Sequence, residues 1–187
     1  ETPNYYPIET RWEEVGIDNK IPLMQKVNER IKSKDNRVVK SRVYISDEDS
    51  YILVATSDGR IVCDYQPLVR FTGVCTAEQN GQRETGYYPV RNRDEIASLK
   101  PDVLNRVADE SVKTALIMFD AVKPQGGEMP VVLAAGGSGV LLHEAMGHPF
   151  EADFNRRGES IFSDKMGQKV AENFVSIADD GTNPHVG

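Results

Sequence analysis

The sequence contains few cysteines, few histidines and no long apolar run. Cys63 and Cys75 are the only cysteines in 187 residues, which is too few for a disulfide framework or a cysteine-based zinc ribbon. Both lie in strand-like segments, where we expect buried thiols. The sequence also lacks a charged-then-apolar leader and an apolar stretch of about 20 residues, the length that crosses a bilayer. These absences predict a cytoplasmic protein that does not bind a membrane.

Basic residues are also in deficit. The formal net charge is −7, with 22 Lys and Arg residues against 29 Asp and Glu residues. A protein that follows a phosphate backbone needs a basic face. The composition therefore argues against direct binding to nucleic acid.

Residues 1–122 predict an α+β domain in which helices cover an antiparallel sheet. After an extended start over Glu1–Thr10, Asp18 can cap a helix that runs to about Lys34. Strand-like segments follow at Val38–Ser46, Tyr51–Ser57, Arg60–Thr76 and Glu84–Val90, with the hairpin-turn pairs Asp58-Gly59 and Asn80-Gly81 between them. A short helix near Arg93–Leu99 and a long helix from about Asp102 to Val122 complete this domain, and the long helix has an apolar face that can cover the sheet.

Residues 123–128 (KPQGGE) predict a linker, and residues 129–187 form a second part of the chain after it. The apolar run Val131–Ala135 predicts a short buried strand. It leads through the glycine-rich turn Gly136–Gly139 into a helix, for which Ser138 is the expected N-cap. The turn resembles G-x-S-x-G and G-x-G-x-x-G motifs but lacks the last glycine of each, so we assign it a structural role.

The ends of the sequence predict a fragment of a longer protein. The chain begins at Glu1 without an initiator methionine, and it stops shortly after a turn signal. That signal, Asp179–Thr182 (DDGT), predicts a turn with Asx-type hydrogen bonding. His185 has no partner at metal-ligand spacing, and we expect it to be a surface residue.

Two of the three histidines flank a glutamate in the run from His143 to His148 (HEAMGH). Imidazole is the commonest protein ligand of zinc, and a glutamate beside a ligand can accept a proton from metal-activated water. The run therefore predicts a metal site with His143 and His148 as ligands and Glu144 as general base. The alternative is a pair of unrelated histidines that cap carbonyl groups at a helix terminus.

The two histidines are one residue further apart than in the zinc-protease motif H-E-x-x-H. Residues four apart differ by about 40° around an α-helix, whereas residues five apart differ by about 140° and point away from each other. A π-bulge would correct this difference, and so would a helix that ends between the ligands. Gly147 resembles a C′ residue, and Pro149 disfavours helical dihedrals at His148. We therefore expect the helix to end there, with His148 folding back.

The segments around this motif carry a family resemblance. They are Gly136–Gly147 (GGSGVLLHEAMG), His148–Phe154 (HPFEADF), Asn155–Gly158 (NRRG) and Asp179–Thr182. Together they resemble the TldD/PmbA family of zinc metallopeptidases, which are also named modulators of DNA gyrase. The resemblance is weaker but collinear before about Val131. It implies that the chain spans the later part of an N-terminal domain and the start of a C-terminal domain.

The resemblance also implies a set of functional residues. It implies that Zn²⁺ is held by His143 and His148, with Glu144 as general base and a third ligand, a cysteine, far downstream of this chain. It further implies peptide substrates bound in a cleft between protomers, in a homodimer or in a heterodimer with a related subunit.

Acidic and basic side chains that follow the second histidine are further candidates for the site. Glu151 and Asp153 could bind the metal, or could hold an imidazole through a hydrogen bond. The alternative for both is ordinary surface charge. Asn155, Arg156 and Arg157 could bind the carboxylate or the backbone carbonyls of a peptide, because guanidinium groups suit such acceptors.

The predicted function is zinc-dependent hydrolysis of small or unfolded peptides by metal-activated water. Zinc sites normally use three or four protein ligands, and two histidines alone make a weak site. We therefore expect the isolated chain to be inactive and to bind zinc poorly. A different class, a non-catalytic regulatory or binding module, stays open as the alternative.

Overall fold

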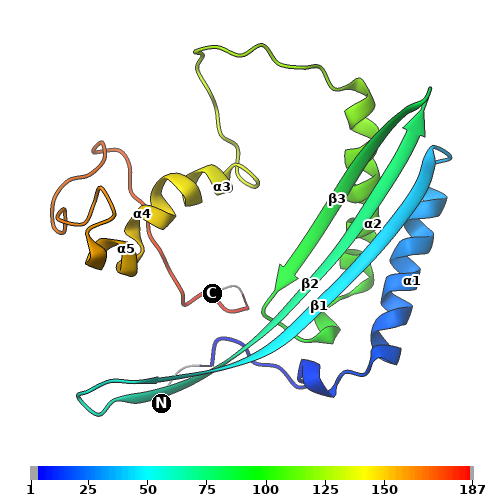
Figure 1. The fold of residues 1–187 in the computed structure, drawn as a ribbon. Helices are drawn as coiled ribbons and strands as arrows, with labels where there is room; N and C mark the ends of the chain where they lie inside the picture. Colours follow the sequence, from blue (N-terminus) through cyan, green and yellow to red (C-terminus); the bar gives the residue numbers. More distant parts are fainter. Residues whose placement is uncertain (1–3, 186–187) are drawn as a thin grey trace. The chain divides into compact units, whose positions relative to one another are not determined.

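The computed structural model describes residues 4–185, which fall into two compact units (Figure 1). Unit 1 comprises Glu1–Lys123 and Asp180–Gly187, and unit 2 comprises Pro124–Asp179. Unit 2 thus begins within the predicted linker, and the last residues of the chain belong to unit 1. Of the extended start expected at Glu1–Thr10, residues 1–3 lie outside the described residues, and residues 4–10 form neither helix nor strand.

Unit 1 is built on a three-stranded antiparallel sheet in the order β1-β2-β3. The strands are β1 (Val38–Ala55), β2 (Ile61–Gln79) and β3 (Gln82–Asn92). A single strand, β1, replaces the two strands expected at Val38–Ser46 and Tyr51–Ser57, because the acidic residues between them stay paired with β2. Cross-strand pairing here overrides their low strand propensity. The hairpin turns are where the sequence places them, with positive φ at Gly59, Asn80 and Gly81.

β1 and β2 extend beyond β3 as a two-stranded ribbon. Pairing with β3 covers only residues 69–79 of β2, so residues 61–68 and their partners on β1 have no third strand. Figure 1 shows this ribbon projecting past the helices. Cys63 lies on the ribbon and is exposed, so the expectation of a buried thiol is wrong there. Cys75 lies in the three-stranded part and is buried as predicted.

Two helices cover one face of the three-stranded part. They are α1 (Ile17–Lys34) and α2 (Pro101–Ile117), and short 3₁₀ turns lie at η1 (Trp12–Glu14), η2 (Ile96–Ser98) and η3 (Met118–Asp120). α1 starts after Gly16, so Asp18 lies in the first turn and is not the cap; an acidic residue there still favours the helix dipole. α2 is shorter than predicted because its last turn tightens into η3.

The core of unit 1 lies between these helices and the sheet. Most of its buried members come from α1, β2 and α2, and partly buried side chains of β1 and β3 pack against them; the buried ones include Val27, Ile31, Val69, Phe71, Cys75, Leu104, Val107, Val112 and Ala115. The helix faces predicted from periodicity are therefore the buried ones. Gly86 of β3 lies directly against the backbone of α2. A Cβ added at Gly86 would lie 2.3 Å from the carbonyl oxygen of Ser111. The α+β class is confirmed.

His185 ties the last residues of the chain to unit 1. Its N–H donates to the carbonyl of Tyr5 (3.1 Å), and its carbonyl accepts from the N–H of Arg93 (3.0 Å). Its Nδ1 lies 3.7 Å from the carboxylate of Asp94. The residue is half-buried, so it lies at the surface as expected but is also bonded to unit 1. The turn predicted just before it is present, because the N–H and Oγ1 of Thr182 both donate to the Asp180 carboxylate.

Unit 2 consists of short helical segments and irregular chain. The helical segments are α3 (Gly139–Leu142), the π-helical turn η4 (His143–Gly147), α4 (His148–Phe150) and α5 (Ala152–Arg157). The strand expected at Val131–Ala135 does not form, because no described segment of unit 2 is a strand that could pair with it. Among the described residues, none of the helices in either unit has the length and hydropathy needed to span a membrane.

Candidate metal centre

The two histidines lie on a helical segment that does not end between them. α3, η4 and α4 follow one another without a break, and the N–H of His148 donates to the carbonyl of His143, five residues earlier. This is the hydrogen bond of a π-turn. His148 is helical, with φ −58° and ψ −44°. The prediction that the helix ends at this point is wrong, and the π-bulge that we considered as its alternative is present.

Neither Pro149 nor Gly147 ends the helix. Pro149 lies in α4 directly after the π-turn, and the residue before it keeps helical dihedrals. Gly147 has φ −60° and is not a left-handed C′ residue. Its lack of a side chain serves another purpose: an added Cβ would lie 3.2 Å from Nδ1 of His143. The glycine therefore leaves room for the His143 ring to lie against the helix backbone.

Ser138 lies at the expected N-cap position of α3 but does not cap it. The structure shows no hydrogen bond from its side chain to the helix N–H groups. Its hydroxyl donates instead to the carbonyl of Ala134, and this bond closes the glycine-rich turn on itself.

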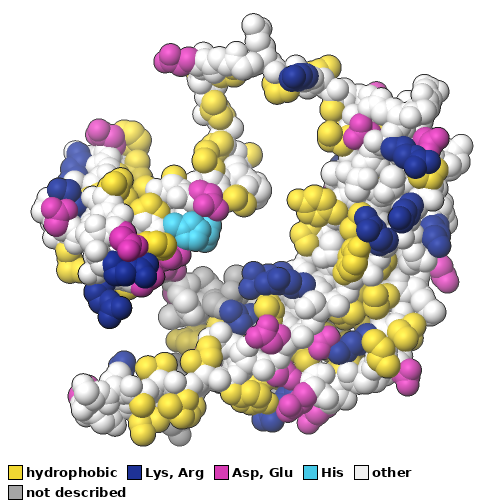
Figure 2. All heavy atoms as spheres, viewed as in Figure 1, with side chains coloured by type: hydrophobic (Ala, Val, Ile, Leu, Met, Phe, Trp, Pro, Cys, Tyr) yellow, Lys and Arg dark blue, Asp and Glu magenta, His cyan; other side chains and the backbone are white. Residues whose placement is uncertain are grey.

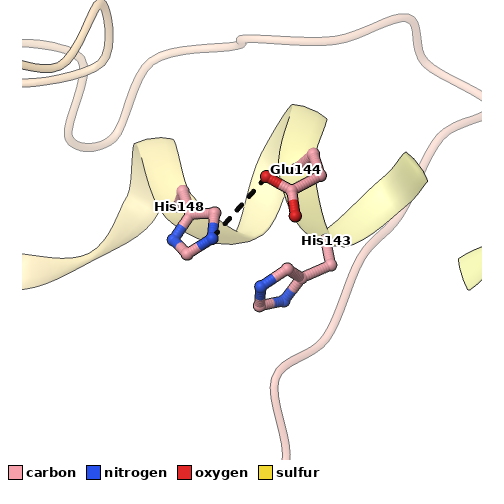
Figure 3. A group of neighbouring side chains, drawn as sticks. All are labelled: His143, Glu144 and His148. Carbon is pink, nitrogen blue, oxygen red and sulfur yellow. Dashed lines mark ion pairs between the residues drawn. The ribbon is translucent and has the colours of Figure 1, made fainter. Parts of the chain in front are cut away.

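The π-turn brings three potential ligands together (Figure 3). The imidazole rings of His143 and His148 have centroids 4.5 Å apart and an interplanar angle of 70°. Nε2 of His148 lies 3.7 Å from a carboxylate oxygen of Glu144. One ligand atom of each of the three residues can be chosen so that all lie within 4.8 Å of one another, and all three residues are exposed. The geometry is that of an open, solvent-accessible donor set.

Glu151 holds the second histidine from the other side. Its carboxylate lies 2.7 Å from Nδ1 of His148. In the tautomer that carries its proton on Nδ1, the ring donates this hydrogen bond and keeps the lone pair of Nε2 free. Nε2 is the nitrogen that faces Glu144. The structure therefore places Glu151 where it orients an imidazole.

Three of the other four candidates after His148 make contacts in or next to the α5 segment. Asn155 donates to the carbonyls of Pro149 (2.8 Å) and Glu151 (2.9 Å) and so ties α5 to the end of α4. Arg157 pairs with Asp153 at 3.1 Å. Arg156 is exposed. The structure thus brings Glu151 next to His148. Asn155, Asp153 and Arg157 instead make contacts that stabilise the segment following Glu151.

A groove of 610 Å³ adjoins His143 within unit 2. One wall comes from the α3–α4 segment and includes His143, and the other comes from residues 170–179. Figure 2 shows histidine side chains at the surface of unit 2, beside hydrophobic and acidic side chains. Our sequence analysis missed the second wall because residues 170–178 lack helical or strand periodicity. The apolar pair Val175 and Ile177, directly before the predicted turn, was the available signal.

Comparison with known proteins assigns the chain to a family. Residues 10–119 match the central domain of the PmbA/TldA metallopeptidases, and residues 126–187 match their C-terminal domain. The chain belongs to the PmbA/TldD metallopeptidase family. The resemblance inferred from the motif and its flanking segments is thereby confirmed.

Individual relatives agree with this assignment. The metalloprotease TldD homolog of Haemophilus influenzae is 37% identical over 182 residues, which cover 91% of this chain and 36% of the relative. The zinc metalloprotease TldD homolog of Saccharolobus solfataricus is 32% identical over 76 residues, 41% of this chain and 17% of the relative. This chain thus spans about a third of the length of the Haemophilus relative.

A solved structure shares the fold. A Bacteroides thetaiotaomicron protein, named as a modulator of DNA gyrase, superposes with a TM-score of 0.72 at 17% sequence identity. The match covers 91% of this chain and 38% of that one. At this identity the likeness concerns the fold alone, and it agrees with the sheet and helices described above.

Proposed function

We propose that this chain carries the metal-binding segment of a zinc-dependent peptidase that hydrolyses small or unfolded peptides. In this proposal His143 and His148 bind the metal and Glu144 is the general base. The observation that carries it is the convergence of these three side chains within 4.8 Å on a single π-turn. The names of the relatives, metalloproteases and in one case a zinc metalloprotease, support the reaction class and the metal.

The donor set fits zinc but does not complete a site. Two imidazoles and a neighbouring carboxylate are groups that zinc accepts, and catalytic zinc sites normally have three protein ligands and one open position. When bound, zinc polarises a carbonyl group and makes water more acidic. We propose that the third ligand lies outside this chain, in a longer protein of which the chain is part, as the resemblance to the family implies.

Each side chain has a distinct part in this proposal. Glu144 is exposed and close to Nε2 of His148, so its carboxylate can take a proton from water at the site and pass it to the leaving amine. Glu151 keeps His148 in one tautomer and one orientation. Arg156, which is exposed, is available for the carboxylate of a peptide. Asn155, together with the Asp153–Arg157 pair, fixes the segment that follows.

We further propose that the longer protein acts in the cytoplasm as a dimer, with itself or with a related subunit. A peptide would bind in a cleft between the protomers. This part rests on the family resemblance. Light scattering of the purified longer protein, alone and mixed with a related subunit, measures the assembly directly.

The test of the catalytic proposal is Glu144→Gln in the longer protein. We expect peptide cleavage to fall by about 10²- to 10⁴-fold, the contribution of a positioned general base, while zinc content and melting temperature stay unchanged. Glu172→Gln is the matched control, because Glu172 is an exposed glutamate of the same unit that pairs with Lys169. Full cleavage by the Glu144→Gln variant would contradict the proposal.

Replacement of His143 and Glu144 by alanine separates two non-catalytic alternatives from the enzyme. A regulatory or binding module loses no function when Glu144 is replaced. In a scaffold stabilised by zinc, His143→Ala lowers the melting temperature and Glu144→Ala does not, because only His143 is a ligand of the metal. The predicted enzyme loses cleavage with both variants.

A further inference from the structure

The sheet of unit 1 has one face under the helices and one open face. Along β2, Val69, Phe71 and Cys75 are buried and belong to the core that the sheet forms with α1 and α2. Successive side chains of a strand point to opposite faces, so the residues between these three point to the open face. Figure 1 shows both helices on the far side of the sheet, away from the viewer. The open face thus lies outside the core of unit 1.

Basic side chains gather on this open face. Figure 2 shows Lys and Arg side chains on this side of unit 1. The strand register places four exposed ones there, which we call the basic face: Lys40 and Arg42 of β1, Arg70 of β2 and Arg91 of β3. Arg83 is also exposed, but it pairs with Glu78 at 2.6 Å. Within residues 4–185, the structure gives the four residues of the basic face neither an ion pair nor a side-chain hydrogen bond.

Two of these cations repel each other. Arg70 and Arg91 lie directly opposite each other on β2 and β3. The residue opposite Arg70 on the other side is Ser46 of β1, so no carboxylate lies in this row. Like charges directly opposite each other destabilise a sheet. Unit 1 therefore carries a repulsion that nothing in the described part of the chain offsets, although the net charge of the chain is −7.

Two exposed tyrosines lie among the cations. Tyr44 and Tyr87 are 50% and 65% exposed and point to the open face from β1 and β3. Arginine and tyrosine are enriched where proteins contact one another. Six residues of β1 from Lys40 span about 20 Å, and three strands span about 10 Å. The basic face therefore has room for one extended segment of about six residues.

Acidic groups limit the basic face at its ribbon end. Glu48 is exposed on the same side of β1, and Asp64 follows on the same side of β2. A nucleic acid would continue past the basic face and meet these carboxylates, in a chain of net negative charge. A short polypeptide segment rich in Asp and Glu would end before them. The charge pattern therefore favours a polypeptide as the partner.

We propose that an acidic segment of the longer protein, outside this chain, covers the basic face and pairs with Arg70 and Arg91. The match to the Haemophilus relative covers 36% of that protein, so most of a protein of that size lies outside this chain. A carboxylate between the two guanidinium groups would replace their repulsion by attraction, because arginine binds carboxylates through strong, charge-assisted hydrogen bonds. The inference rests on the part of the proposed function that makes this chain a piece of a longer protein, and not on the catalytic mechanism.

The first experiment needs no variant. This chain and the longer protein are acetylated with N-hydroxysuccinimidyl acetate, and mass spectrometry follows the rate at Lys40. Only the uncharged amine reacts, and a carboxylate beside it favours the charged form, so we expect the rate in the longer protein to be at least about tenfold lower. In urea, where neither protein is folded, the two rates should be equal. Equal rates in the folded proteins would overturn the proposal.

Arg70→Glu tests whether charge holds the segment in place. In this chain it replaces a like-charged pair by an oppositely charged one, so we expect the melting temperature to rise by about 1–3 °C. In the longer protein it places a carboxylate against the acidic segment, so the melting temperature should fall and the rate at Lys40 should return towards that of this chain. Lys26→Glu is the matched control, because Lys26 is exposed on α1, which covers the other face of the sheet; it should affect the two proteins alike. A rise in both proteins, with Lys40 still protected, would refute the proposal.

Two further outcomes would assign the basic face to another partner and so reject the acidic segment. Protection of Lys40 that disappears on dilution would assign the face to a second subunit. A labelled single-stranded oligonucleotide that binds the longer protein, and binds it more weakly after Arg70→Glu, would assign the face to nucleic acid.

Acetylation does not depend on cleavage, so this inference and the proposed function can fail separately. Protection of Lys40 together with undiminished cleavage by Glu144→Gln would retain the acidic segment and reject the proposed mechanism. Cleavage that depends on Glu144, with Lys40 unprotected in the longer protein, would reject the acidic segment alone.

Discussion

Unit 1 and unit 2 differ in where their apolar side chains lie. All of the buried hydrophobic residues belong to unit 1, where burial between helices and sheet supplies most of the folding free energy. No described residue of unit 2 is buried, and Val132 and Met166 are 96% and 98% exposed. Unit 2 is held instead by local hydrogen bonds around its histidines. The candidate ligands thus lie in a unit that has no core of its own within this chain, which spans about a third of the length of the Haemophilus relative.

The largest expected difference between the units is in the free energy of unfolding lost when one aromatic ring is removed from each. Phe71 of β2 is fully buried, and we expect Phe71→Ala to lower the free energy of unfolding of this chain by about 3–5 kcal/mol. Phe174→Ala in unit 2 should change it by no more than about 0.5 kcal/mol, because that side chain is exposed. Urea denaturation followed by circular dichroism measures both. Equal costs would mean that unit 2 has a core of its own.

The two cysteines sharpen the contrast within unit 1, between the ribbon and the core. Burial raises the pKa of the Cys75 thiol to about 11, whereas Cys63 is exposed on the ribbon. Because the thiolate is the reactive form and the raised pKa leaves only about one Cys75 thiol in a thousand ionised at pH 8, we expect iodoacetamide to modify the exposed Cys63 at least about a hundredfold faster. Peptide mass spectrometry resolves the two sites. In urea the rates should converge, and equal rates in the native chain would contradict the structure.

A smaller, pH-dependent effect is expected at the end of α1. Side-chain and backbone hydrogen bonds from Arg37 lower the pKa of Asp35 to about 2. A lowered pKa in the folded state stabilises the fold above the unfolded value near pH 4, and this contribution is lost as the pH falls towards 2. Since the pair is partly exposed, Asp35→Asn should cost less than about 1 kcal/mol at pH 7.

The same substitution should cost much less at pH 2, where about half of the folded wild-type molecules have already lost the charge on Asp35. Urea midpoints of the two proteins at pH 7 and pH 2 supply the comparison. A difference that is the same at both pH values would show that the carboxylate charge does not matter.

The smallest effect is expected from zinc on this chain alone. Two histidines make a weak site, and unit 1 owes its stability to packing. Excess zinc or EDTA should therefore leave the melting temperature of unit 1 unchanged to within about 1 °C. Differential scanning calorimetry and zinc titration check this expectation. Tight stoichiometric binding would break it, and would point to Glu151 or Asp153 as a third ligand.

The fold of unit 1 could be predicted from sequence because burial there follows periodicity. Val27 and Ile31 share one face of α1, and the asparagine–glycine pair marks the turn between β2 and β3, where the structure has positive φ. The errors lie where tertiary pairing overrides local preference. The acidic residues of β1 resemble a loop but stay in the ladder. Cys63 is exposed because it lies in the part of β2 that does not pair with β3.

The candidate site could be predicted only through its chemistry. The residue types and spacing identified His143, Glu144 and His148, yet the expected break at Gly147 is a π-turn. A proline disfavours helical dihedrals in the preceding residue without forbidding them. The sequence alone does not show whether this cost exceeds the gain from the hydrogen bond between His148 N–H and the carbonyl of His143. The Val131–Ala135 strand failed for a different reason: a strand exists only with a partner, and its own residues do not reveal one.

The π-turn accommodates one residue more than the zinc-protease motif H-E-x-x-H has between its histidines. Deleting Ala145 would leave a histidine, a glutamate, two residues and a histidine, which is the H-E-x-x-H order. Its histidines would lie about 40° apart on an ordinary α-helix. The extra residue widens one turn and restores that juxtaposition at the longer spacing, while everything after it is rotated by about 100°. The directions in which Phe150 and Glu151 point, towards the groove and the imidazole, are therefore consequences of one inserted amino acid.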